Sequence, residues 1–324
     1  MTVSRNGFLL LNKKSGDTSF DSLKTVKKVF GTGKVGHTGT LDKFASGLLV
    51  VLVGRGVKLA PLFSGCIKEY IGTVSFGAET NTLDPEGAVI ARGPVPSLPQ
   101  IEAALAAFRG DILQSPPAYS AVHINGRRAH ELVREGQEPE MKRRPVTVYS
   151  LEILSWAPPD AVIQVRCSAG TYIRSLARDI ALAADSRAYL SALKRTRVGA
   201  FRLEDSVEGD SGNLVDALRP LDRKLFGALS LPYFLIDEKA AESFTHGKPL
   251  RELLAQAALN TEAAGGSVET AGSEAPAAGV FRQENPRDFL KNTPGESGSP
   301  ADKLLGVLER RNGAWSYGHV FADN

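Results

Sequence analysis

A glycine-rich stretch, GTGKVGHTGTLDKFASG at residues 31–47, constrains the fold more than any other part of the sequence. Its first six residues have the G-x-G-x-x-G spacing of a dinucleotide-binding turn. That turn requires a strand before the glycines, a helix after them and an acidic residue about 20 positions on. In this chain the order is reversed, because residues 20–30 have apolar side chains at helical spacing and GLLVVLVG at 47–54 has the apolar run of a buried strand.

The stretch is therefore predicted to be a loop that connects a helix to a strand. The acidic residue of the dinucleotide fingerprint is also missing, which argues against a nucleotide-cofactor enzyme. A phosphate-binding loop of the Walker type is excluded as well, since no Gly-Lys-Ser or Gly-Lys-Thr closes the run.

The rest of the first two thirds of the chain predicts many strands with intervening helices. Strands are expected at 7–12, 68–77 and 143–156, and helices over 98–108 and from about residue 173. Because there is no regular βαβ alternation, the pattern indicates an α+β domain with a mixed, largely antiparallel sheet. This main unit is predicted to span residues 1–228.

Residues 229–324 are predicted to form a second, smaller, β-rich unit. Between its two apolar ends, residues of about 256–302 are rich in Ala, Gly, Ser, Glu and Pro. Such a composition buries too little apolar surface to order itself, so a disordered insertion is expected there.

The charges are unevenly distributed along the chain. The net charge is only +3, yet residues 1–60 carry ten Lys or Arg against three Asp, while residues 231–324 carry nine basic and thirteen acidic groups. The positive field is therefore expected around the glycine-rich loop, where it would attract a polyanion, although a solvated basic face explains the same charges.

Cysteine usage and hydropathy exclude several classes of protein. Cys66 and Cys167 have no neighbouring Cys or His at ligand spacing, so we expect two reduced thiols, no metal site and a cytoplasmic setting. The longest apolar run, LLVVLV at 48–53, is far shorter than the roughly 18 residues of a membrane helix, so no membrane association is expected.

Two residues of the glycine-rich loop are candidates for chemistry. Asp42 is the only acid between Asp21 and Glu69, so its carboxylate is a candidate nucleophile, general base or metal ligand. The alternative is a loop aspartate that accepts backbone hydrogen bonds. His37 is either a loop histidine bonded to the backbone or a contact to nucleic acid.

Three later segments add candidates. Tyr70 lies on an alternating strand, where it either packs in the core or stacks on a base. Arg174 opens a helix beside apolar residues, and a half-buried arginine there calls for a carboxylate partner such as Asp42. Arg195 lies in the basic segment LKRTRVGAF at 193–201, which is either a set of phosphate contacts or solvated charge.

Taken together, these segments resemble the TruB family of tRNA pseudouridine synthases. The resemblance covers about residues 7–202 and rests on five blocks in the family's order. They are GHTGTLDKFASGLLVVLVG, KEYIGTVSFGAETNTLDPEG, QSPPAYSAVHINGRRAHELVREG, VRCSAGTYIRSLARDI and LKRTRVGAF. It implies a pseudouridine synthase catalytic domain, and more weakly a PUA-like RNA-binding domain over residues 229–324.

The resemblance also implies roles for individual residues. Asp42 would be the nucleophile, Tyr70 the residue that stacks on the target ring, and Arg174 the ion-pair partner that keeps Asp42 charged by lowering its pKa. His37 would help to fill the space left by the flipped base. The remaining positions would contact the uridine or the RNA: Lys58, Tyr172, Leu193 and, from its basic segment, Arg195.

The implied reaction is the isomerisation of a uridine in the T-arm of tRNA, at tRNA position 55, by a monomer that needs no cofactor and no metal. A non-catalytic tRNA-binding or tRNA-folding protein on the same scaffold is the alternative. The chain departs from the family pattern at Lys43, where proline is usual, and at His123, where lysine is common. Loss of the proline removes a restraint on φ, so the loop after Asp42 is expected to be less pre-organised.

Overall fold

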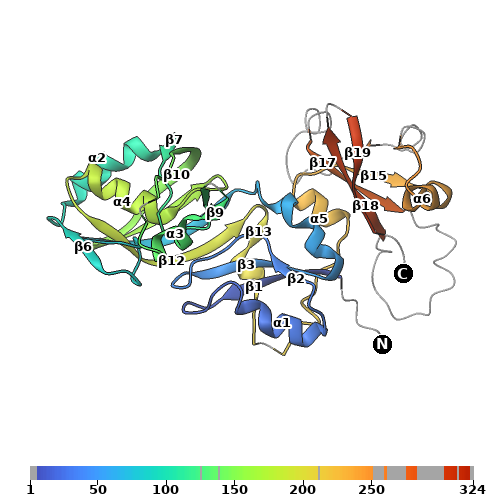
Figure 1. Cartoon of the computed structure of the whole chain (residues 1–324), viewed down its shortest axis with the longest axis horizontal. Helices are drawn as coiled ribbons and strands as arrows, with labels where there is room; N and C mark the ends of the chain where they lie inside the picture. Colours follow the sequence, from blue (N-terminus) through green and yellow to red (C-terminus); the bar gives the residue numbers. More distant parts are fainter. Residues whose placement is uncertain are drawn as a thin grey trace.

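The computed structural model describes residues 6–124, 126–137, 139–210, 212–250, 259–260, 275–282, 303–311 and 314–321. Two sheets dominate these residues and lie side by side along the long axis of the molecule (Figure 1). The larger sheet has the strand order β14-β1-β3-β12-β4-β11-β10-β7, with β2 added to β3 and β13 added to β12. Its strands are β1 (Gly7–Lys13), β2 (Val35–His37), β3 (Ser46–Val53), β4 (Lys68–Phe76), β7 (Gly110–Gln114), β10 (Arg144–Ala157), β11 (Asp160–Cys167), β12 (Ala188–Val198), β13 (Phe201–Arg202) and β14 (Val207–Glu208).

This sheet is mixed and largely antiparallel, as predicted. Its two parallel pairings join β1 to β14 and β3 to β12. The second parallel pairing lies in the middle of the sheet, where Gly47 of β3 is opposite Arg195 of β12. The loop that contains Asp42 leads directly into β3 and therefore sits over the centre of the sheet.

Helices cover both faces of the larger sheet. The helices are α1 (Ser22–Phe30), η1 (Gly54–Phe63), α2 (Leu98–Leu105), η2 (Ala106–Phe108), α3 (Ala129–Arg134), α4 (Ile173–Ala183), η3 (Leu203–Asp205), α5 (Arg223–Ala228) and α6 (Glu238–Thr245). Three residues of the predicted apolar face of α1, Leu23, Val26 and Phe30, pack on one side of β1 and β3. The fourth, Phe20, precedes the helix and is exposed. Alternate side chains of β3 pack on its other side with η1 and α5, which explains the unbroken apolar run of this strand.

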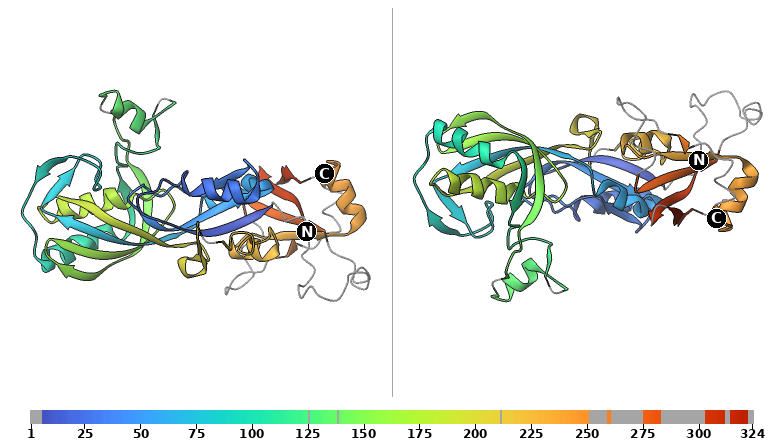
Figure 2. Two further views of the ribbon diagram at one scale, coloured as in Figure 1. Left: turned by 90° about the horizontal axis from the view of Figure 1, so that it is seen from below. Right: turned by 90° about the horizontal axis from the view of Figure 1, so that it is seen from above.

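Two small hairpins extend from the main sheet. One is formed by β5 (Ala78–Thr80) and β6 (Val89–Arg92), and its turn reaches the loop between β2 and β3, where Glu86 pairs with Lys43. The other is formed by β8 (His123–Ile124) and β9 (Arg127–Arg128), followed by α3. We call β8, β9 and α3 the arm, because Figure 2 shows this green segment projecting from the body of the protein.

The second sheet has the order β16-β15-β17-β18-β19. Its strands are β15 (Tyr233–Ile236), β16 (Leu259–Asn260), β17 (Ala277–Arg282), β18 (Lys303–Arg311) and β19 (Ala314–Val320). A disordered insertion over about 256–302 is wrong for β17, whose residues 277–281 are buried in the sheet. The rest of that predicted insertion, apart from residues 259–260 and 275–276, lies outside the described residues.

The two sheets share one apolar cluster. Phe226 of α5 stacks edge-on against Phe281 of β17, with ring centroids 5.3 Å apart. Both rings belong to the cluster that also contains Leu48 and Leu52 of β3. The second sheet is thus packed against the larger one through a continuous apolar core.

Candidate active site

The loop that carries Asp42 joins β2 to β3 and is held by hydrogen bonds from several directions. The Leu41 N–H donates to Ser19 Oγ (2.8 Å), and this hydroxyl donates back to the Leu41 carbonyl (3.0 Å). The buried guanidinium of Arg195 donates to the carbonyl of Gly39 at 3.1 Å and to that of Leu48 at 2.7 Å. The loop is therefore fixed before any substrate binds.

Arg195 thus has a different position from the one expected of a phosphate contact. Only 2% of its surface is exposed, and its donors point at backbone carbonyls. The reason is that the basic segment continues β12, a central strand, so alternate side chains turn into the protein.

A buried guanidinium joins Asp42 to a second carboxylate. Arg174, in the first turn of α4, donates from Nη2 to Asp42 Oδ1 (3.0 Å) and from Nη1 to Asp84 Oδ2 (3.2 Å). Its Nε lies 2.9 Å from Asp42 Oδ2, although the N–H is not directed at that oxygen. The carbonyls of Thr82 and Tyr119 accept further bonds at 2.8 and 3.1 Å. The predicted pairing of Arg174 with Asp42 is present in the structure.

Exposure distinguishes the two carboxylates. The side chain of Asp84 is 7% exposed, whereas that of Asp42 is 36% exposed. Asp84 also accepts from the Thr82 hydroxyl at 2.6 Å and from the Glu86 N–H at 3.0 Å. Asp84 is therefore built into the protein, and Asp42 is the carboxylate that a ligand can reach.

The pKa of Asp42 is shifted in the opposite direction to the one predicted. Burial raises the pKa of the Asp42 carboxyl, and the nearby Asp84 carboxylate adds to the rise, while Arg174 and Lys13 act against it. The predicted effect of Arg174 has the expected sign, but removal of water from the carboxylate outweighs it, so the net shift of the pKa is upward.

Tyr70 lies close to this pair, and His37 lies close to Arg195. Tyr70, on β4, is 8% exposed, and burial raises its pKa, with the Arg195 charge opposing and the Asp42 charge adding to the rise. His37 ends β2, and its Nδ1 is buried with no hydrogen-bond partner among the described residues. Burial and then the Arg195 charge lower the pKa of His37, which favours a neutral ring.

Two other predicted residues border the same region. Leu193 is a buried residue of β12 opposite Gly72 of β4, in the apolar cluster that includes Tyr70. Tyr172 precedes α4, and its backbone forms two hydrogen bonds with the Gln114 side chain. The amide of Gln114 donates to the Tyr172 carbonyl (3.0 Å) and accepts from the Tyr172 N–H (2.8 Å). Asp42, Arg174 and Tyr70, which come from three separate segments of the sequence, are thus close together, and His37 lies near Arg195.

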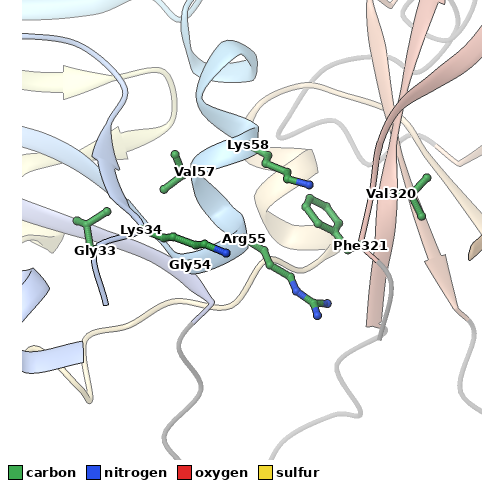
Figure 3. A pocket seen from close by; sticks show the side chains of 9 residues that line it. Gly33, Lys34, Gly54, Arg55, Val57, Lys58, Val320 and Phe321 are labelled. Carbon is green, nitrogen blue, oxygen red and sulfur yellow. The ribbon is translucent and has the colours of Figure 1, made fainter. Parts of the chain in front are cut away.

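Lys58 lies apart from this cluster, in η1 beside the second sheet. It lines a pocket of about 490 Å³ together with Lys34 and Arg55, and Val320 and Phe321 form the opposite wall (Figure 3). Lys58 Nζ is 5.8 Å from the centre of the Phe321 ring. Three cations, and no carboxylate among the described residues, line this pocket, which makes this part of the junction between the sheets positively charged.

Sequence reasoning missed Asp84 and Lys13. The sequence places Asp84 only in a D-P-E-G turn; the residue before it, Leu83, has a φ of +62°, a strained conformation of the kind found at functional sites. Lys13 is 1% exposed and donates to the carbonyls of Asp17 (2.5 Å) and Lys43 (3.4 Å). No sequence signal separates Lys13 from the solvated lysine that follows it.

The loop is restrained at Lys43 in spite of the missing proline. The Lys43 carbonyl accepts a 2.8 Å hydrogen bond from the Gly16 N–H in addition to the bond from Lys13. The Lys43 side chain is exposed, with Nζ 3.8 Å from Glu86 Oε1. The other departure from the pattern, His123, is an exposed residue of the arm.

The described residues include no group of three His, Cys, Asp or Glu that could hold a metal ion. None of the helices among these residues has the length and hydropathy of a membrane span.

Comparisons with known proteins agree with this arrangement. Residues 27–173 match the family described as TruB family pseudouridylate synthase (N terminal domain). Solved structures also resemble the chain. The Cbf5-Nop10-Gar1 complex matches with a TM-score of 0.63 and 24% identity over 94% of this chain and 85% of that one. An archaeal box H/ACA Nop10-Cbf5 complex matches with a TM-score of 0.63 and 22% identity, over 99% and 87%. At these identities the likeness concerns the fold alone.

Curated relatives are closer in sequence. The tRNA pseudouridine synthase B of Borreliella burgdorferi (strain ZS7) is 50% identical over 204 residues, which cover 62% of this chain and 72% of that protein. The tRNA pseudouridine synthase B of Treponema denticola is 37% identical over 306 residues, covering 78% and 86%. The chain therefore belongs to the TruB family of pseudouridylate synthases.

Proposed function

We propose that the protein isomerises one uridine in the T-arm of tRNA to pseudouridine, with Asp42 as the nucleophile. The observation that carries this proposal is the partly exposed Asp42 carboxylate, held by the buried Arg174 beside Tyr70. A protein that only bound RNA would not need an acid desolvated in this way, because a carboxylate repels phosphate and costs free energy to desolvate. The relatives named tRNA pseudouridine synthase B support tRNA as the substrate.

The chemistry requires one nucleophile and no redox change. The bond between ribose C1′ and uracil N1 breaks, the uracil turns, and a new bond joins C1′ to C5. The proton on C5 is released and N1 gains one, so the atoms balance. The Asp42 carboxylate attacks either C6 of the ring or C1′ of the sugar, and in both cases it leaves again at the end.

The remaining residues of the cluster have supporting roles in this proposal. The target base is flipped out of its stack at a cost of a few kcal/mol, and stacking on Tyr70 offsets part of that cost. His37 occupies the space left by the flipped base, and Leu193 and Tyr172 line the uridine pocket. Arg195 supports the loop from below, as its bonds to the Gly39 and Leu48 carbonyls indicate.

Two basic surfaces extend the proposed RNA interface. The arm and the residues that follow it carry exposed arginines and a lysine, namely Arg127, Arg128, Arg134, Lys142, Arg143 and Arg144. The junction pocket contributes Lys34, Arg55 and Lys58. Both surfaces suit the phosphates of an RNA stem-loop whose target base lies between them.

The proposal assigns residues 1–228 to the catalytic domain and 229–324 to a PUA-like RNA-binding domain, in a monomer that works in the cytoplasm. The separate five-stranded sheet supports the second domain. Cys66 and Cys167 are both free thiols, which suits a reducing compartment.

Mapping pseudouridine in an unmodified tRNA transcript tests the proposal. A carbodiimide adduct that survives only on pseudouridine stops reverse transcriptase one nucleotide before the modified site. The expected result is a single stop in the T-arm after incubation with the protein. Stops at several unrelated uridines would contradict the T-arm assignment. A tRNA that is bound tightly but acquires no stop would favour the non-catalytic tRNA-binding alternative.

A further inference from the structure

Residues 114–122 lead from the end of β7 into the arm. This segment also contacts α4, the helix that carries Arg174. The Ser175 hydroxyl donates to the Ser115 carbonyl at 2.8 Å, and Gln114 brackets the backbone of Tyr172. The carbonyl of Tyr119 accepts from Arg174 Nη2 at 3.1 Å. Any shift of this segment therefore moves an acceptor that holds the guanidinium next to Asp42.

The far end of the same segment is attached to the arm at the start of α3. His130, in the first turn of this helix, has its ring Nδ1 2.9 Å from the Ser120 carbonyl, and its backbone N–H donates to the same oxygen at 3.2 Å. The neighbouring Ala129 N–H donates to the Val122 carbonyl at 2.8 Å. The Ser120 hydroxyl is buried and has no partner among the described residues, so Ser120 is held through its backbone.

We propose that His130 is a positioning residue that couples RNA binding on the arm to the Arg174–Asp42 pair. A movement of the arm when RNA binds would reach Arg174 through Ser120 and Tyr119. This inference rests on the proposed function of the site. The ring acts as a donor from Nδ1, since a carbonyl oxygen only accepts. Without that bond, the hydrogen bonds that still join the arm to segment 114–122 among the described residues are backbone ones, and the Tyr119 carbonyl is free to move away from Arg174.

The pKa of the Asp42 carboxyl makes the coupling measurable. The groups that act on the Asp42 carboxyl are Arg174 from α4, Lys13 from β1 and Asp84 from the β5–β6 turn, and the first two lower its pKa. A guanidinium that is held less firmly lowers the pKa less. Loss of the His130 bond is therefore expected to raise the titration midpoint of Asp42, although His130 does not touch Asp42.

The experiment compares wild type, His130→Ala and His130→Asn. Asparagine carries an amide donor close to the position of Nδ1, so it can keep the bond to Ser120. In His130→Ala we expect kcat on a T-arm hairpin to fall about 3- to 10-fold, the factor that one hydrogen bond supplies. The acid limb of the pH profile of kcat/KM should move to higher pH. His130→Asn should restore both kcat and the position of this limb.

A matched control separates coupling from RNA binding. Arg134 is exposed at the other end of the same helix, and its side chain forms no hydrogen bond to Ser120 within the described part of the chain. Arg134→Gln is therefore expected to raise KM while leaving the acid limb in place. If His130→Ala behaves in the same way as Arg134→Gln, or if His130→Asn is as impaired as the alanine variant, the proposal is wrong.

A second measurement does not depend on activity. The carboxyl carbon of Asp42, labelled with carbon-13, is titrated by NMR in the free protein, and His130→Ala should raise its midpoint relative to wild type and His130→Asn. An unchanged midpoint overturns the coupling, whatever the enzyme does to RNA. If wild type does not modify RNA and His130→Ala still raises the midpoint of Asp42, the proposed function is contradicted and the coupling stands.

Discussion

At the scale of single residues, the site depends on the competition between burial and charge at Asp42. Burial raises its pKa and Arg174 lowers it, while Asp84 shares the same guanidinium. The pairing of Asp42 with Arg174 was predictable because a half-buried arginine needs an acid. Asp84 was not, because nothing local shows that a turn 90 residues before Arg174 contacts the same side chain.

The first prediction concerns the pH dependence of catalysis. Because the pKa of Asp42 is raised above its ordinary value of 3.8, the active carboxylate is lost on acidification at a higher pH than for an ordinary aspartate. Asp84→Asn removes a negative charge that contributes to this rise, while the Thr82 and Tyr119 carbonyls still hold Arg174. We expect the acid limb of kcat/KM to move to lower pH.

The control for this prediction is Glu86→Gln. Glu86 is an exposed acid in the same turn, and it is not among the main groups that shift the pKa of Asp42. Its replacement should leave the limb where it is. An acid limb that stays in place or rises in Asp84→Asn would contradict the electrostatic account of the site.

At the scale of elements, the parallel pairing of β3 with β12 places the loop over the sheet. Regular apolar periodicity made α1 and β3 predictable. β12 was missed because its sequence, AYLSALKRTRV, mixes charged and apolar side chains, and the fate of its arginines depends on neighbours that the sequence does not show. β17 was missed because it is a short apolar run inside a stretch of low-complexity composition.

The second prediction tests this pairing at Gly47. Its φ is +101°, and a Cβ added there would lie 2.4 Å from the Arg195 carbonyl oxygen. Gly47→Ala therefore combines backbone strain with a clash against backbone, and we expect the free energy of unfolding to fall by at least about 1–3 kcal/mol in urea titrations. Gly65→Ala, where a Cβ meets open space, should change it by less than about 0.5 kcal/mol. Equal losses in the two variants would show that the close approach at Gly47 is unimportant.

At the scale of the whole molecule, a single apolar cluster connects the two sheets. It includes Phe8 and Leu48 from the larger sheet, Phe226 from α5 and Phe281 from β17. The composition predicted two units, and two large sheets dominate the described residues. The continuity of their core could not be predicted, since it depends on which aromatic residues, far apart in the sequence, meet in space.

The third prediction is that the two sheets unfold together. Trp156 lies in the larger sheet next to Phe76, and Trp315 lies in the second sheet next to Phe234. The chain has only these two tryptophans, so Trp156→Phe and Trp315→Phe each leave one fluorescent reporter. We expect the midpoints of the two urea transitions to coincide once each variant's own change in stability is subtracted. Transitions that remain separated would mean that the shared cluster does not couple the two units.

The central claim, that Asp42 performs the isomerisation, is tested most directly by tritium release from a T-arm hairpin labelled at uridine C5. Wild type and Asp42→Asn are compared at RNA concentrations that saturate both proteins. The account predicts release of one tritium per hairpin by wild type and none above background by Asp42→Asn. Release by Asp42→Asn at the wild-type rate would contradict the role of Asp42, and tight binding without release by either protein would contradict the enzyme itself.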